Sequence, residues 1–217
     1  MSATASPLHG AYAPGAPTPR TGRPFVVLEG ISGIGKSTLA HVLAQRLGAG
    51  TLHTVPDFYM PWAPVMNMNT RALPQFAFYL SGVLHASDII RAHLPHGPVV
   101  SDRYISSVIA YHSAVHELGM ARVRDLIEPF RSYLVTPDRT FYLRCTDATL
   151  KARMASKKDY NQDDDDMLKV PGRLGRLRAN FDKVASDDPT AVIIDTDDRT
   201  PGELADLITT RLTETSP

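Results

Sequence analysis

The sequence has little of what marks secreted, membrane and nucleic-acid-binding proteins. It contains one cysteine, Cys145, so no disulfide can form within the chain. Its 23 Lys and Arg residues balance 23 Asp and Glu residues, so no net charge draws it to nucleic acid or to an anionic membrane. No apolar run approaches the roughly 18 residues of a membrane-spanning helix, and the start lacks the parts of a secretory signal. These absences predict a cytoplasmic protein with no nucleic-acid or membrane partner.

Residues 1–23 contain little that could be buried. The segment is mainly Pro, Ala, Gly, Ser and Thr, which cannot offset the entropy of ordering a chain. The whole chain is 43% hydrophobic, and the residues after this segment suffice for one buried core. We therefore expect a disordered tail over residues 1–23 and a single folded domain over residues 24–217.

From residue 24 onwards, short β-branched runs alternate with amphipathic stretches. This alternation is typical of a parallel sheet wrapped by helices. It predicts an α/β protein of three layers, with a five-stranded parallel sheet and helices on both faces. The expected strands are residues 25–29, 51–55, 98–101, 140–144 and 191–195. After the first strand, apolar residues repeat at helical spacing and predict a helix that ends at Gly48. A second helix is predicted over residues 75–93.

A phosphate-binding loop lies between the first predicted strand and the first predicted helix. Residues 30–37 read GISGIGKS and fit the pattern GxxxxGK[ST] in the context that supports it. The glycines let backbone N–H groups converge on phosphate oxygens, Lys36 reaches the β and γ phosphates, and the Ser37 hydroxyl is a magnesium ligand. The loop predicts ATP and Mg²⁺ as cofactors. The expected ATP-binding residues here are Gly30, Ser32, Gly33, Ile34, Gly35, Lys36, Ser37 and Thr38.

The segment Asp102-Arg103-Tyr104 directly follows the third predicted strand, at the sheet edge where open α/β folds bind ligands. An acid there can hold a magnesium-bound water or a substrate hydroxyl, and an arginine can stabilise charge on a phosphoryl group in transfer. Taken alone, the pair fits a helix cap with a salt bridge equally well. We expect Asp102 and Ser37 to be the metal ligands, and Lys36, Asp102 and Arg103 to be catalytic.

Two segments together resemble the thymidylate kinases. FVVLEGISGIGKSTLA is similar to the family's phosphate loop, and DRYISSVIAYH is similar to its DRYxxSxxAYQ motif. The similarity continues in FYLRCTDATLKARM and in VIIDTDDRTPGELADLI, so it covers residues 24 to about 212.

This resemblance implies a P-loop kinase fold, an ATP-dependent kinase activity and a homodimer. It also implies a lid around residues 154–172, with Arg153 near the adenine of ATP. Lys157 and Lys158 are the candidate catalytic cations of this lid, and one of them is expected to close on the phosphates, although lysines in such a loop also fit a solvated surface. It places Arg103, Ser107 and Tyr111 at the acceptor.

The chain departs from the thymidylate kinase pattern where the acceptor phosphate is held. Ser32 stands where the family usually has an acid. The family also has an arginine after the second strand, but residues 53–62 contain none, and Gly82 falls where the family has a second arginine. A buried dianion without arginine partners is costly, which argues against a monophosphate acceptor unless Arg71 or Arg91 substitutes.

The same stretch resembles the deoxynucleoside kinases, which place a carboxylate five residues before a tryptophan, as Asp57 and Trp62 are here. Such a carboxylate can accept the proton of an acceptor hydroxyl. Gln75 falls where those kinases read the base, and Phe76, Phe78 or Tyr79 could stack on it, although ordinary core packing also explains these aromatic residues. The expected acceptor contacts are Asp57, Trp62, Gln75, Phe76, Tyr79, Arg103, Ser107 and Tyr111.

The sequence thus favours an ATP-dependent phosphotransferase that acts on a nucleoside or nucleoside-like alcohol, with Asp57 as a catalytic base. The alternative is a thymidylate or other nucleoside monophosphate kinase. A P-loop NTPase that hydrolyses nucleotide without a small-molecule acceptor is the alternative of another class. The acidic run at residues 163–166 is typical of a solvated, mobile loop.

Overall fold

The computed structural model describes residues 22–213. All but the last two residues of the predicted tail therefore lie outside the described part of the chain. Five strands form one parallel sheet in the order β2-β3-β1-β4-β5, which confirms the predicted fold class. The strands are β1 (Phe25–Glu29), β2 (Gly50–His53), β3 (Val99–Asp102), β4 (Arg139–Arg144) and β5 (Ala191–Asp195).

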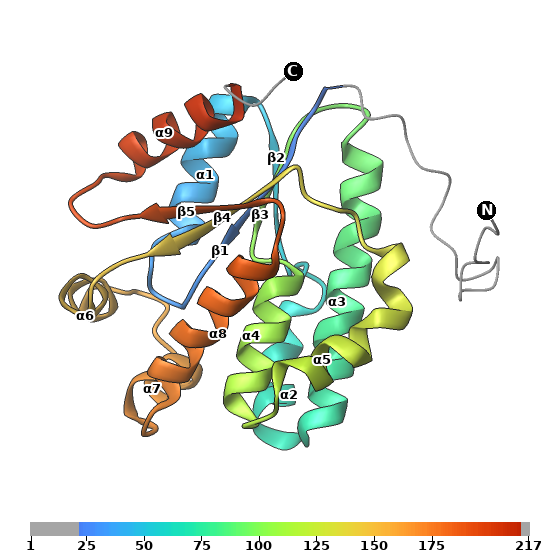
Figure 1. The fold of residues 1–217 in the computed structure, drawn as a ribbon, viewed down its shortest axis with the longest axis vertical. Coiled ribbons are helices and arrows are strands. Elements are labelled where there is room, and N and C mark those ends of the chain that lie inside the picture. The colour runs from blue at the N-terminus through green and yellow to red at the C-terminus, as the bar shows by residue number, and fades with distance from the viewer. Residues whose placement is uncertain (1–21, 214–217) are drawn as a thin grey trace.

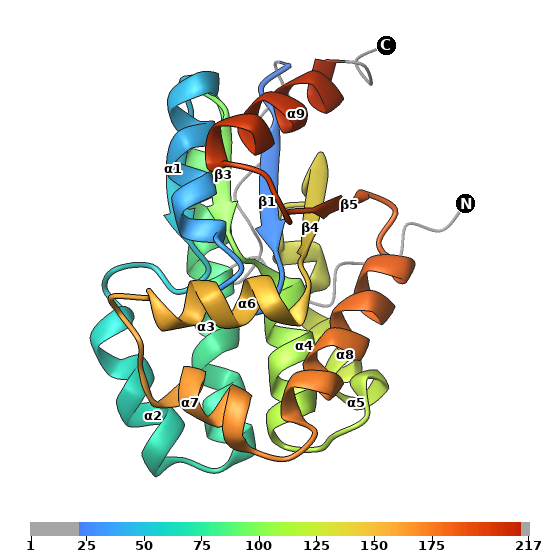
Figure 2. The same ribbon diagram turned by 90° about the vertical axis from the view of Figure 1, so that its left-hand side faces the viewer.

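Helices cover both faces of this sheet. Figures 1 and 2 show α1 and α9 together on one face and α3, α4 and α8 on the other, while α2, α6 and α7 lie beyond the carboxyl ends of the strands. The α-helices are α1 (Lys36–Leu47), α2 (Ala63–Asn69), α3 (Ala72–His93), α4 (Ile105–Val115), α5 (Met120–Ile127), α6 (Asp147–Ala155), α7 (Gln162–Lys169), α8 (Arg173–Asp187) and α9 (Pro201–Thr213), with two 3₁₀ helices at η2 (Met60–Trp62) and η3 (Glu128–Tyr133). Among residues 22–213, no helix is long and apolar enough to cross a membrane.

The central strand β1 lies at the core of the protein. β1 pairs with β3 on one side and with β4 on the other, and all five of its residues are buried. Four of them are apolar, which favours a strand covered on both faces. The fifth, Glu29, is a fully buried carboxylate at the strand end. Helix α1 then ends, as predicted, at Gly48 in a left-handed conformation with φ of 59°.

Two local predictions differ from the structure. β2 ends at His53 and not at residue 55, because the backbone N–H of Val55 turns back to the His53 ring. The acidic run is a helix and not a solvated loop. Asn161 and Asp164 form a reciprocal capping box at the start of α7, and the side chain of Asp164 is only 2% exposed.

Candidate active site

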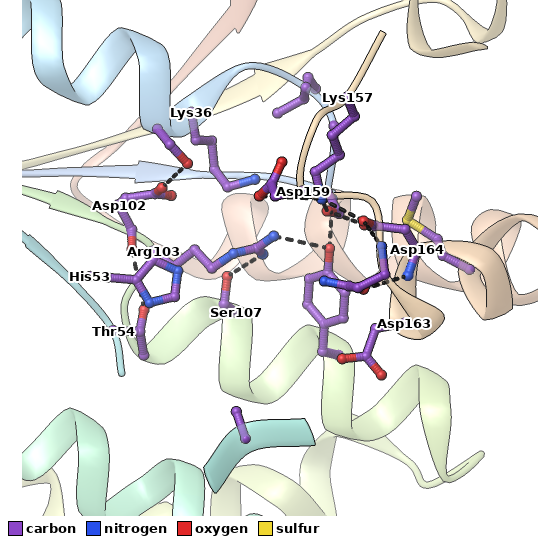
Figure 3. Close-up of a pocket in the computed structure, with 18 of the residues that line it drawn as sticks. Lys36, His53, Thr54, Asp102, Arg103, Ser107, Lys157, Asp159, Asp163 and Asp164 are labelled. Carbon is purple, nitrogen blue, oxygen red and sulfur yellow. Dashed lines mark hydrogen bonds and ion pairs between the residues drawn. The ribbon is translucent and has the colours of Figure 1, made fainter. Parts of the chain in front are cut away.

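A cavity of about 1120 Å³ opens at the carboxyl ends of β1 and β3. The phosphate loop, the end of β3 and helices α2, α3, α4 and α7 all contribute residues to it. Parallel sheets with helices on both faces bind ligands at this edge. Figure 3 shows the side chains that converge there, with Lys36 and Asp102 on one side and the lid residues Lys157 and Asp164 on the other.

The phosphate loop depends on glycine for its shape. Gly30 has φ of 141°, and a Cβ there would lie 2.9 Å from the carbonyl oxygen of Leu143. The loop directs Lys36 into the cavity, where its Nζ donates to the carbonyl oxygen of Ile31 at 2.7 Å. Burial, and then the charge of Arg103, lowers the pKa of Lys36 to about 7. An anion beside this amine would stabilise its charged form.

Asp102 and Ser37 form a pair of oxygen ligands beside the loop. The Ser37 hydroxyl donates to Asp102 Oδ2 at 2.5 Å. Asp102 Oδ1 is buried and has no hydrogen-bond partner among the described residues. Burial by itself raises the pKa of Asp102, but Lys36, Arg103 and His53 outweigh it, so the net shift is downwards and the group is a carboxylate. A buried carboxylate oxygen without a partner, next to a hydroxyl, fits a hard divalent cation.

Arg103 is the partly buried cation at the centre of the cavity. One of its terminal nitrogens donates to the carbonyl oxygen of Gly30 and to the Ser107 hydroxyl, each at 3.2 Å, and the other donates to the Tyr111 hydroxyl at 3.4 Å. The guanidinium also lies 4.8 Å from the centre of the Tyr111 ring. Within residues 22–213, no carboxylate lies at ion-pair distance from it.

The lid contacts the phosphate loop directly. Asp164 on α7 accepts a hydrogen bond from the Ser32 hydroxyl at 2.6 Å and forms an ion pair with Lys157 at 2.5 Å. Burial raises the pKa of Asp164, but the bonds from Lys157 and Ser32 outweigh it and lower the pKa overall. Lys158 also lines the cavity, but its side chain is exposed. The two lid lysines are therefore not equivalent.

Amide and hydroxyl side chains line the other end of the cavity, beside Asp163, which accepts from the Asn67 amide at 2.7 Å. Asn67 Oδ1 accepts from the Gln75 amide at 2.7 Å and from the Tyr79 hydroxyl at 2.8 Å. The Gln75 carbonyl oxygen contacts His116, whose ring lies 4.6 Å from that of His112 at a tilt of 54°. Burial, and then His116, lowers the pKa of His112 to about 4, so this ring is uncharged at neutral pH. This end can hydrogen-bond a neutral heterocycle.

Most of the predicted site residues meet at this cavity. Those that line it are Ser32, Gly33, Ile34, Gly35, Lys36, Ser37, Thr38, Gln75, Tyr79, Asp102, Arg103, Ser107, Tyr111, Arg153, Lys157 and Lys158. Arg153 is held at its edge, since its guanidinium donates to the carbonyl oxygens of Ile34 and Thr196.

Three predicted acceptor residues do not reach the cavity. Asp57 and Trp62 are exposed and do not line it, and Phe76 is buried in the core. The structure thus gives no support to Asp57 as the base of an alcohol kinase. Arg71 and Arg91 also lie outside the lining, and Arg91 is paired with Asp88.

The lining also includes residues that were not predicted from the sequence, among them His53, Asn67, His112 and Asp164. The spacing Asn161-x-x-Asp164 is a capping-box signal and could have revealed the start of α7. Asn67 carries no local signal, because its partners lie on α3 and α7.

The thymidylate kinase family model matches residues 65–207, which is more than half of the chain. The chain belongs to the thymidylate kinase family. It is therefore an ATP-dependent kinase, a phosphotransferase. Curated thymidylate kinases are similar to it at low identity. That of Prochlorococcus marinus is 27% identical over 78% of this chain and 84% of its own length, and that of Leifsonia xyli is 31% identical over 65% and 72%.

Solved thymidylate kinase structures share the fold. The thymidylate kinase from Candida albicans superposes with a TM-score of 0.69 at 20% identity, over 88% of this chain and 92% of that one. The thymidylate kinase from Ehrlichia chaffeensis gives 0.65 at 21% identity, over 88% and 98%. At such identities the likeness shows the fold alone.

Proposed function

We propose that the protein transfers the γ-phosphoryl group of ATP to a nucleoside monophosphate of the thymidylate type. This is the alternative from the sequence, and family membership fits it better than the nucleoside acceptor that the sequence favoured. The observation that carries the proposal is the cation at the centre of the cavity, Arg103, which has no carboxylate ion-pair partner within residues 22–213.

An acceptor phosphate would complete the surroundings of Arg103. Burial opposes the charge of Arg103, but neighbouring groups, Tyr111 and Asp102 foremost, outweigh it and hold its pKa above the usual value. A phosphate would add the direct ion pair that the guanidinium lacks within residues 22–213, and it is the group that the planar fork matches best. Its bonds to Gly30, Ser107 and Tyr111 are long, at 3.2–3.4 Å. These three bonds do not use all five N–H donors of the guanidinium, so donors remain for a phosphate. Arg103 belongs to the Asp-Arg-Tyr motif that the family shares, so it offers the acceptor phosphate one cation but does not replace the two missing family arginines.

The opposite end of the cavity suits a neutral base. Asn67, Gln75 and Tyr79 form a network of amide and hydroxyl groups there. A nucleotide would lie with its base on this network and its phosphate at Arg103, so that the phosphate faces the loop that holds ATP. The cavity volume of about 1120 Å³ lies above the range of roughly 300–1,000 Å³ that is usual for a single small-molecule ligand, which is in keeping with a site for two nucleotides.

The remaining roles follow from the geometry of the loop and lid. Lys36 would bind the β and γ phosphates of ATP, and Ser37 and Asp102 would hold Mg²⁺, directly or through water. The cation held there would supply positive charge that offsets the charge of the phosphates. Lys157 would contact the transferred group from above, and Arg153, which is tied to the loop at Ile34, would contact the adenine.

The experiment that tests this function is a binding titration. Calorimetry should measure dTMP and thymidine against the parent and against Arg103→Gln, with Arg71→Gln as a matched arginine variant outside the cavity. A phosphate held by a guanidinium predicts that the parent prefers dTMP by at least about tenfold. That preference should disappear in Arg103→Gln and remain in Arg71→Gln. Equal affinity of the parent for dTMP and thymidine would instead support the nucleoside acceptor.

A further inference from the structure

Glu29 is a buried carboxylate that none of the proposed roles uses. It is the last residue of β1 and the residue directly before the phosphate loop, and it is 0% exposed. No cation lies at ion-pair distance from it within residues 22–213. Burying a carboxylate without an ion pair is expensive unless hydrogen bonds compensate. The position therefore needs an explanation beyond filling the core.

The compensation comes from the N-terminus of α4. Glu29 Oε1 accepts from the backbone N–H of Tyr104 at 2.8 Å and from that of Ser107 at 3.1 Å, and Oε2 accepts from the Ser107 hydroxyl at 2.6 Å. The helix has no side-chain cap from its own N-cap residue, Tyr104, which directly precedes Ile105. A carboxylate is favourable at this end because it accepts from N–H groups of the first turn and meets the positive end of the helix dipole. The N–H of Ser107 is shared, since it also donates to the carbonyl oxygen of Tyr104 at 3.2 Å. Glu29 thus caps α4 from another strand.

This cap lies next to a strained turn. Arg103, between β3 and α4, has φ of 71°, a left-handed conformation that arginine seldom adopts. Its backbone N–H donates to the carbonyl oxygen of Leu28 at 2.9 Å. The carbonyl of Leu28 and the carboxylate of Glu29 therefore hold two successive amides, those of Arg103 and Tyr104.

The same carboxylate is linked to the Arg103 side chain. The Ser107 hydroxyl donates to Glu29 and accepts from the Arg103 guanidinium at 3.2 Å, the bond drawn between Arg103 and Ser107 in Figure 3. Glu29 thus holds the amide that follows Arg103 and, through Ser107, the Arg103 side chain. The residue after Glu29 is Gly30, whose carbonyl oxygen is a further acceptor for Arg103. The geometry joins the first residue of the phosphate loop to the central cation.

We propose that Glu29 is a positioning residue that aims Arg103 at the acceptor and at the transferred phosphoryl group by capping α4 and binding Ser107. This inference rests on the proposed function in one respect only, namely that Arg103 binds the acceptor. Glu29 touches no substrate. Its removal should therefore act through Arg103 and leave the ATP side, which Lys36 and the loop backbone hold, nearly unchanged.

The test is a kinetic double-mutant cycle of parent, Glu29→Gln, Ser107→Ala and the double variant. All four proteins are assayed with the acceptor that the parent phosphorylates best. The identity of that acceptor tests the proposed function, and the kinetics of the variants with it test the role of Glu29. Glu29→Gln should lower kcat and raise the acceptor KM, with kcat/KM for the acceptor down at least about tenfold and the ATP KM within about threefold. Because both residues act through Arg103, the double variant should lose no more than about twice what the worse single variant loses.

The matched control is Tyr104→Phe. It removes the hydroxyl that bonds Ser87 and so loosens the same end of α4, but it keeps the backbone N–H that Glu29 binds. Its kcat/KM for the acceptor should stay within about twofold of the parent. If Glu29→Gln fails to fold, Glu29→Asp carries the test, because it keeps the charge but is one methylene too short to reach Ser107 as Glu29 does. Parent-like acceptor kinetics in Glu29→Gln or in Ser107→Ala, independent losses in the cycle, or an equal loss in Tyr104→Phe would overturn the inference.

Discussion

The Ser32 hydroxyl on the phosphate loop donates a hydrogen bond of 2.6 Å to Asp164 on the lid helix α7. The same carboxylate binds Lys157, so one acidic side chain joins the loop, the lid helix and the lid lysine. A contact between these parts is expected to respond to nucleotide binding, because the γ phosphate competes for Lys157 and for the space above the loop.

Lys157 and Lys158 should therefore differ in turnover. Lys157→Ala is expected to lower kcat by about tenfold or more, since it removes a cation aimed at the transferred group. Lys158→Ala is the neighbouring control and should stay within about twofold, because its side chain is exposed. Steady-state kinetics at saturating ATP measures both. Equal effects of the two substitutions would contradict the assignment of Lys157.

The contact between lid and loop should break when a second carboxylate is placed opposite Asp164. Ser32→Asp puts like charges at the position of the present hydrogen bond, so α7 should move away from the loop. Trypsin cleavage after Lys157 or Lys158 in the native protein should then be faster by about threefold or more. Ser32→Ala loses the bond without the repulsion and should change the rate less. Cleavage of Ser32→Asp at the parent rate would show that the contact does not hold the lid.

Glu29 should give the folded state a recognisable dependence on pH. Burial raises its pKa from 4.5 to about 7, against the opposing effects of Ser107, Arg103 and Tyr104. A carboxyl whose pKa is raised on folding contributes stability that is present below pH 4.5 and is lost as the pH rises to about 7. The charged and titratable groups that face it are Arg103, Lys36 and Tyr142.

Histidines act in the opposite direction, because the lowered pKa of His112 makes the fold less stable as the pH falls. The measurement is therefore a difference. The free energy of unfolding of Glu29→Gln, relative to the parent, should rise between about pH 4.5 and 7 and stay level above that range. Urea denaturation at several pH values provides it. A difference that does not vary with pH would mean that Glu29 titrates normally.

Asp57 should have no part in catalysis. It is exposed and outside the cavity, so Asp57→Asn should leave kcat within about twofold. Asp102→Asn is the comparison within the site, and it should lower kcat by about a hundredfold or more through the loss of a metal-ligating charge. Initial rates with saturating Mg²⁺ distinguish the two. A large loss in Asp57→Asn would restore the alcohol kinase with Asp57 as its base.

The parts of the site that could be predicted from the sequence are those formed by consecutive residues. The phosphate loop and the Asp102-Arg103-Tyr104 segment carry their geometry locally, in glycines and at a strand end. Asp57 and Trp62 matched a spacing, but spacing alone does not determine which way a loop faces. Asn67 and Asp164 enter the site through contacts with distant residues, and the run that contains Asp164 has the composition of a solvated loop. Glu29 is hidden within an apolar strand, where its partners on α4 are 75 and 78 residues away.

The most direct test of the account is the identity of the phosphorylated product. The protein should be incubated with Mg²⁺ and ATP and with equal amounts of thymidine and dTMP, and the products separated by ion-exchange chromatography. Because Arg103 would hold the acceptor phosphate, the account predicts that dTDP forms and that thymidine is not consumed. Conversion of thymidine to dTMP without dTDP would contradict it and would assign the cavity to a nucleoside acceptor.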